Sequence, residues 1–128
     1  MEFDVLLLDH HEGNPRNSEG SFIELEDQHI LFTYSRYQGT SPHDNANADI
    51  ALRESFDGGR TWSAEDRIIV DHKALDVENI MSTSMLKLSN GRVLLFVLIK
   101  FKSADDRINC IPAVTYSDDL GKNWSKPV

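Results

Sequence analysis

The sequence has little of what marks disulfide-rich, nucleic-acid-binding or membrane-spanning proteins. Cys110 is the one cysteine among 128 residues, which excludes an internal disulfide and a cysteine-ligated metal cluster. The net charge of −8 argues against a surface for nucleic acid or anionic membranes. No apolar run is long enough to span a membrane, and residues 5–8 are too few for a signal peptide. We therefore expect a soluble protein in which Cys110 is a small buried strand residue.

Helical periodicity is almost absent, and short alternating segments account for nearly all of the pattern. Turn-forming residues predict loops at 13–18 and 38–47, and residues 71–79 form a connection with room for one helical turn. The predicted fold class is therefore all-β. The predicted strands are residues 3–8, 21–25, 29–36, 48–55, 67–70, 84–88, 92–100 and 110–117.

The second half of the chain repeats the first. Ser84 lies 63 residues after Ser21, and Ser117 lies 62 residues after Ser55. A period of this size with about four strands per unit is typical of propeller blades, whereas a β-sandwich gives no reason for a repeat in register. We expect blade 1 at about 16–70 and blade 2 at about 78–128 of a six-bladed β-propeller. With the remaining blades missing, apolar side chains of these two would be exposed.

Two eight-residue segments carry the pattern Ser-x-Asp-x-Gly-x-x-Trp, at residues 55–62 and 117–124. The Ser hydroxyl and the Asp carboxylate can accept backbone N–H bonds and hold a tight turn. The glycine supplies a positive φ, and the tryptophan folds back as an apolar plug. We interpret these Asp boxes as determinants of the fold, with Asp57 and Asp119 structural and not catalytic.

The paired boxes resemble those of the sialidase (neuraminidase) superfamily and other proteins with bacterial-neuraminidase (BNR) repeats, where they lie away from the active site. Residues 21–55 resemble more specifically the opening blade of bacterial-type sialidases. Asp44 lies 11 residues before Ser55, where that family has its general acid. The resemblance therefore implies that Asp44 protonates the leaving-group oxygen. The alternative is a solvated aspartate that caps a turn.

The resemblance also implies two substrate-binding arginines. Arg16 precedes the first hairpin, two residues before the family's usual position, and the alternative is a surface arginine in a polar loop. Arg36 ends the second strand where sialidases commonly have an arginine, and its counterpart in the second unit is Ile99. The alternative for Arg36 is an edge arginine paired with Asp44 or Asp49.

Sialidase chemistry makes these residue types intelligible. A sugar carboxylate beside the anomeric carbon calls for guanidinium groups, and sialidases use a Tyr nucleophile in place of a second carboxylate. In the family that Tyr, its Glu partner and further arginines come from later blades. We therefore interpret the chain as an N-terminal fragment of a sialidase-like glycoside hydrolase that acts on a sialoside or related glycan. We predict that the fragment is inactive alone and needs no cofactor or metal; adjacent His10 and His11 lack a third ligand nearby.

Two other functions fit the same sequence. Asp boxes also occur in non-catalytic propellers that bind glycans or proteins. The displaced Arg16 is also compatible with a hydrolase for a different sugar, acidic or neutral. A late tyrosine, a glutamate and two more arginines downstream would favour the sialidase.

Overall fold

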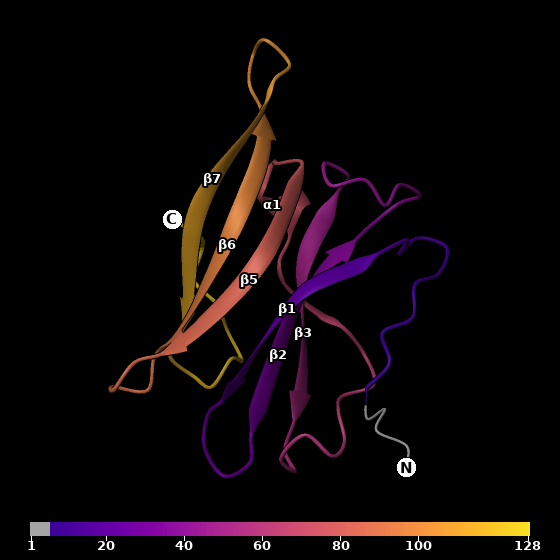
Figure 1. The fold of residues 1–128 in the computed structure, drawn as a ribbon. Helices are drawn as coiled ribbons and strands as arrows, with labels where there is room; N and C mark the ends of the chain where they lie inside the picture. Colours follow the sequence, from indigo (N-terminus) through magenta and orange to yellow (C-terminus); the bar gives the residue numbers. More distant parts are fainter. Residues whose placement is uncertain (1–5) are drawn as a thin grey trace.

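The computed structural model describes residues 6–128, whose regular secondary structure is almost entirely β-strand. Figure 1 shows two twisted antiparallel groups of strands lying side by side. We call them the first unit (β1–β4) and the second unit (β5–β7). Their elements are β1 (Asn17–Glu24), β2 (Ile30–Tyr37), β3 (Ala48–Ser55), β4 (Arg67–Val70), helix α1 (His72–Leu75), β5 (Asn79–Lys87), β6 (Val93–Lys102) and β7 (Ile108–Ser117).

The strands follow one another in space as they do along the chain. The order is β1-β2-β3-β5-β6-β7, with β4 paired to the outer side of β3. Every pair within a unit is antiparallel, and its successive strands are joined by tight turns or by the longer loops 38–47 and 56–66. A single parallel bridge between Ala48 and Asn79 joins the units. The structure is thus an open seven-stranded all-β arrangement made of two similar halves.

The core lies between the two units. One cluster contains Leu31 and Leu52 of the first unit with Val93 of the second, and the other contains Ile50 with Ile80. Burying each of these side chains contributes roughly 1.5–3 kcal/mol. The apolar contact between the units is therefore what holds the two sheets against each other.

The two Ser-x-Asp-x-Gly-x-x-Trp segments form the same hydrogen-bonded turn. The Ser55 hydroxyl accepts the Gly59 N–H at 2.8 Å and donates to Asp57 at 2.8 Å. Asp57 accepts the Thr61 N–H at 2.8 Å, and the Trp62 indole donates to the Gly59 carbonyl at 3.1 Å. The second segment repeats these bonds through Ser117, Asp119, Gly121, Asn123 and Trp124.

Both aspartates in these turns are held ionised by bonds internal to the turn. The side-chain and backbone hydrogen bonds from Thr61 lower the pKa of Asp57 to about 2. The bonds from the backbone and side chain of Asn123 lower the pKa of Asp119 to about 2. A carboxylic acid with such a pKa carries no proton to donate near neutral pH. This supports the structural interpretation of both residues.

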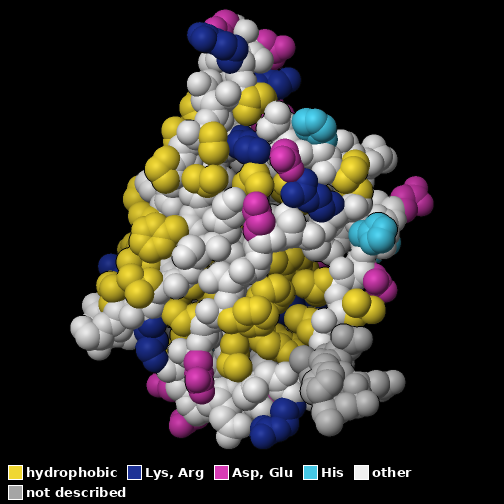
Figure 2. Space-filling model, in the orientation of Figure 1, with side chains coloured by type: hydrophobic (Ala, Val, Ile, Leu, Met, Phe, Trp, Pro, Cys, Tyr) yellow, Lys and Arg dark blue, Asp and Glu magenta, His cyan; other side chains and the backbone are white. Residues whose placement is uncertain are grey.

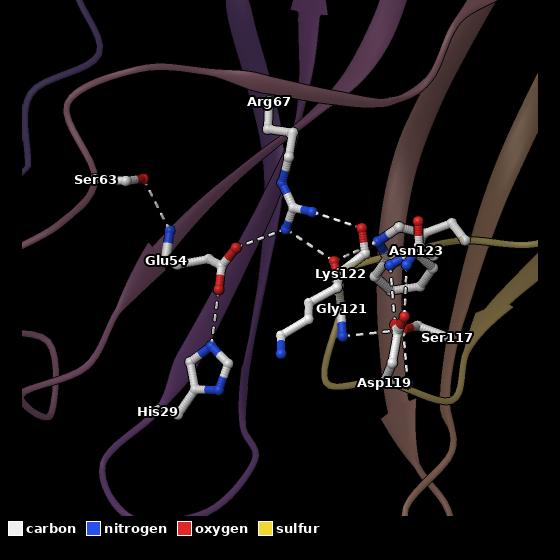
Figure 3. Close-up of polar contacts among 10 residues, drawn as sticks. His29, Glu54, Ser63, Arg67, Ser117, Asp119, Gly121, Lys122 and Asn123 are labelled. Carbon is white, nitrogen blue, oxygen red and sulfur yellow. Dashed lines mark hydrogen bonds and ion pairs between the residues drawn. The ribbon is translucent and has the colours of Figure 1, made fainter.

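The second turn segment docks onto the first unit through Arg67 (Figure 3). The Arg67 guanidinium donates to the carbonyls of Gly121 and Lys122, both at 2.8 Å, and to the Glu54 carboxylate at 2.6 Å. Glu54 also lies 2.9 Å from the His29 ring. One arginine of β4 therefore satisfies carbonyls that the tight turn leaves free, and it ties the two units together.

Large apolar side chains lie on the outer faces of both units, as expected. Phe22 is 62% exposed and stacks on Phe32 with ring centroids 4.2 Å apart. On the second unit Leu86 is 50%, Phe96 42% and Ile111 47% exposed. Figure 2 shows hydrophobic side chains gathered over the lower ends of β1–β3 and along the outer side of the second unit.

Several sequence expectations change in the structure. The predicted strand at 3–8 lies partly outside the described residues, and residues 6–8 form no strand. Strand β5 begins at Asn79 instead of 84, because a register shift between Met81 and Ser84 interrupts the alternation. Cys110 is exposed and not buried, because β7 is the edge strand of the described sheet and pairs only with β6. The helical turn expected in 71–79 is α1.

Within residues 6–128, no helix combines the length and the apolar character needed to cross a membrane.

Candidate functional site

The structure brings Arg16 and Asp44 together although 28 residues separate them. Arg16 immediately precedes β1, and Asp44 lies in the 38–47 loop between β2 and β3. An Arg16 Nη1 contacts Asp44 Oδ1 at 2.5 Å and also donates to the Pro42 carbonyl at 3.1 Å. The guanidinium lies over the Tyr37 ring, 4.6 Å from its centroid. Stacking and hydrogen bonding together fix the guanidinium plane against the loop.

The Arg16–Asp44 pair is accessible to solvent. The side chain of Arg16 is 30% exposed and that of Asp44 65%. The hydrogen bond from Arg16 and its positive charge lower the pKa of Asp44, and the bond to Asp44 raises the pKa of Arg16. Both groups are therefore charged in the free protein, and a ligand can reach either of them.

An open cleft of about 350 Å³ adjoins this pair. Its walls are the 10–13 segment, Pro15 and the 39–42 turn. Pro15 precedes Arg16 in the chain, and Pro42 accepts the hydrogen bond from Arg16. Arg16 and Asp44 do not themselves line this cleft, but each lies within two residues of one that does.

Arg36 does not join the other two predicted site residues. Its Nε donates to Asp66 at 2.9 Å, and among the described residues it makes no hydrogen bond to Arg16 or Asp44. The pairing of Arg36 with Asp44 or Asp49, considered as the structural alternative, is wrong. The β2–β3 register sets Arg36 opposite Asp49, but the guanidinium turns to the segment that leads into β4.

Asp66 is the centre of a cluster that the sequence did not reveal. It accepts from Arg36, from Arg53 at 2.7 Å and from the Tyr34 hydroxyl. Burial opposes ionisation of Asp66, but these hydrogen bonds outweigh it and its pKa is lowered. Burial, followed by the bond to Asp66, raises the pKa of Tyr34. Tyr34 is therefore a poor nucleophile, and Asp66 is an anchor for two arginines.

Glu19 and Ser82 occupy equivalent positions, 63 residues apart, in β1 and β5. Each sits at a register shift with a positive φ, 49° for Glu19 and 60° for Ser82. Such a backbone costs an ordinary residue about 1–3 kcal/mol. The Ser82 hydroxyl donates to the Glu19 carboxylate at 2.9 Å. Glu19 thus pairs with the second unit and not with a neighbouring arginine.

Asp49, Asp71 and His72 lie close enough to hold a metal ion, but their ligand atoms already serve the fold. Asp49 accepts from the His72 backbone at 2.8 Å, lies 2.6 Å from the His72 ring and accepts from Gln38. Asp71 caps α1 by accepting the Lys73 N–H at 2.8 Å. We interpret the group as a hydrogen-bonded lock on α1.

Comparison with known proteins finds similarity to a sialidase sequence. No protein-family model matches the chain. A sialidase of Clostridium perfringens is 26% identical over an alignment of 115 positions that covers 83% of this chain. The chain spans 30% of the length of that relative.

Solved structures show the same arrangement of strands. A protein of unknown function from Dyadobacter fermentans DSM 18053 superposes with a TM-score of 0.74 at 20% identity, over 93% of this chain and 37% of that one. Hadza microbial sialidase Hz136 also gives a TM-score of 0.74, at 16% identity over 91% of this chain and 26% of that one. The fold is sialidase-like. Zg3597, a family 117 glycoside hydrolase from Zobellia galactanivorans, gives 0.68 at 16% identity over 92% of this chain and 40% of that one.

Proposed function

We propose that the chain is part of a sialidase-like glycoside hydrolase in which Asp44 protonates the leaving group and Arg16 binds the substrate's carboxylate. The observation that carries the proposal is the contact between these two residues at 2.5 Å beside an open cleft. A guanidinium with free N–H groups is the side chain best suited to a carboxylate. An aspartate beside it is within reach of the neighbouring glycosidic oxygen.

A general acid must carry a proton, whereas Arg16 lowers the pKa of Asp44 in the free protein. The substrate resolves this conflict. A sugar carboxylate that takes the Arg16 guanidinium removes the main cause of the lowered pKa and brings a negative charge close to Asp44. Both effects raise the pKa of Asp44. The turn aspartates Asp57 and Asp119 are different, because their stabilising bonds are internal and no ligand replaces them.

The remaining chemistry belongs to a longer protein in this proposal. The chain spans 30% of the sialidase that it matches, and the exposed apolar faces of both units suit packing against further blades of a propeller. The nucleophilic Tyr, its Glu partner and further arginines then come from those blades. The chain alone is expected to be inactive.

Arg36 is a second anion-binding group in this proposal. To reach a substrate, its guanidinium must leave Asp66, which Arg53 continues to neutralise at 2.7 Å. Tyr34 of this cluster stacks on Phe32, which in turn stacks on Phe22. In this proposal a neighbouring blade packs on these aromatic rings, and its contacts decide whether the Arg36 guanidinium turns toward the site.

Replacing Arg16 with methionine in the full-length protein is expected to raise KM for sialyllactose about 10- to 100-fold. A charge-assisted hydrogen bond contributes roughly 1.5–3 kcal/mol, which corresponds to this range. Initial-rate kinetics on sialyllactose and on a panel of neutral glycosides measure the effect and its selectivity.

Arg92 offers a matched control for this substitution. It pairs with Asp118 at 2.7 Å and lies 4.0 Å over the ring of Tyr116, as Arg16 pairs with Asp44 and stacks on Tyr37. Arg92→Met should leave KM within about twofold, since surface pairs contribute little. Equal effects of Arg16→Met and Arg92→Met would contradict the binding role. A neutral glycoside as the best substrate of the unaltered protein would favour a hydrolase for a different sugar.

A non-catalytic glycan-binding propeller is the second candidate. The observation in its favour is that Asp44 is ionised and 65% exposed in the free protein, as a ligand-binding carboxylate would be. The two functions require different protonation states of Asp44: a binder uses the ionised carboxylate, whereas the hydrolase needs a protonated acid in the substrate complex. A binder should therefore hold its glycan without releasing a sugar, while the hydrolase should release sialic acid.

A further inference from the structure

The loop that carries Asp44 has few bonds of its own. The backbone N–H of Gln38 donates to the Asn47 carbonyl at 2.8 Å and closes the base of the loop. Within it, the Ala46 N–H donates to the His43 carbonyl at 2.8 Å, and two longer bonds join the His43 N–H to Ser41 Oγ at 3.3 Å and the Asn45 N–H to the His43 ring at 3.5 Å. Residues 40–45 are exposed. A ten-residue exposed connection with so few internal bonds would sample many conformations.

The second unit holds this loop with two side chains. Lys100 Nζ donates to the Asp44 carbonyl at 2.8 Å and to Asn45 Oδ1 at 3.3 Å. Asn79 Nδ2 donates to the Ala46 carbonyl at 2.6 Å. Asn79 and Lys100 are cross-strand partners in the β5–β6 ladder, so a single residue pair of the second unit fixes the backbone at Asp44 and two residues beyond it.

A contribution to folding stability does not by itself explain why Asn79 and Lys100 occupy these positions. Asn79 is fully buried, and its Oδ1 has no hydrogen-bond partner among the described residues, which costs roughly 1–3 kcal/mol. Lys100 makes no ion pair within residues 6–128; its ammonium group serves only neutral oxygens. The positive charge also lowers the pKa of Asp44, after the larger effect of Arg16. Both side chains are thus used to place the loop.

We propose that Lys100, supported by Asn79, is a positioning residue that fixes the direction of the Asp44 side chain from the neighbouring unit. Arg16 binds the same loop from the first unit, through the Pro42 carbonyl and the Asp44 carboxylate. When a substrate carboxylate takes Arg16, that restraint weakens, and the bonds from Lys100 and Asn79 still hold the backbone on both sides of the acid. This inference rests on the proposed role of Asp44.

Lys100→Met in the full-length protein tests the proposal, since methionine keeps the apolar stem and removes the donor. We expect kcat on sialyllactose to fall about 10- to 100-fold with KM changed by less than about threefold, because a misplaced catalytic group costs rate more than binding. Amide hydrogen exchange of peptides covering residues 38–47 should become faster. Lys100→Arg, which retains a donor, should recover most of kcat and protection.

Lys102 is the matched control, because it lies two residues further along β6 and pairs with Asp106 at 3.5 Å, outside the loop. Lys102→Met should leave both readouts unchanged. Asp44→Asn must first show the large loss of kcat expected of the general acid. Given that loss, unchanged hydrogen exchange or an unchanged kcat in Lys100→Met would overturn the positioning role of Lys100. Full activity of Asp44→Asn would instead overturn the proposed function, and the positioning role would fall with it.

Discussion

Asp44→Asn in the full-length protein is expected to lower kcat on sialyllactose by about 10²- to 10⁴-fold, the usual contribution of a general acid. Asparagine keeps the size of the side chain and an oxygen for Arg16, so the loop should remain in place. The loss should be much smaller on an aryl sialoside, whose phenolate departs without a proton. Comparing kcat for the two substrates measures the need for protonation directly.

Asp118→Asn is the control for this experiment. Asp118 is also an exposed aspartate in an arginine pair, and the bond from Arg92 likewise lowers its pKa. It lies in the second turn segment, outside the proposed site, and its substitution should change kcat by less than about twofold. Equal losses of Asp44→Asn on both substrates would show that Asp44 does not act as a proton donor.

Gly121→Ala is expected to destabilise the 128-residue chain by roughly 2–5 kcal/mol. Gly121 has φ +83°, which costs alanine about 1–2 kcal/mol. A Cβ at this position would lie 2.6 Å from Leu31 Cδ1, in the core between the units, and overpacking adds about 1–3 kcal/mol. Urea denaturation followed by tryptophan fluorescence measures the free energy of unfolding.

Gly59→Ala separates the two causes. Gly59 is the equivalent position in the first turn segment, with φ +88°, but its nearest atom would be Ile30 Cδ1 at 3.6 Å. This variant should therefore lose only the backbone part, about 1–2 kcal/mol. Equal losses in Gly59→Ala and Gly121→Ala would mean that the second turn segment does not pack on Leu31.

The parts of the fold that depend on neighbouring residues could be predicted from the sequence. Strand β3 and strand β4 match the predicted strands 48–55 and 67–70, and the turn segments form the bonds expected of their Ser, Asp and Gly. The bulges at Glu19 and Ser82 could not be predicted, because a residue with positive φ breaks the period of two. For this reason the alternating pattern predicts the start of β5 at residue 84, whereas the strand begins at Asn79.

The candidate site shows the same division. The resemblance predicts Asp44 and Arg16 as site residues, and the structure brings the two side chains into contact. The Asp66 cluster depends on how β2, β3 and the segment before β4 come together, so no local pattern indicates it. Asn79 and Lys100 reach the site from the other unit. Only the packing of the two units makes their roles visible.

The pKa of Asp44, measured by carbon NMR of the labelled carboxylate with and without bound sialic acid, tests the account most directly. We predict a pKa below the usual aspartate value in the free full-length protein and a clear rise when sialic acid binds. In Arg16→Met the free value should move up toward that of an ordinary aspartate, and added sialic acid should shift it little. A pKa of Asp44 that stays low while sialic acid is bound would contradict the exchange of Arg16 between Asp44 and the substrate.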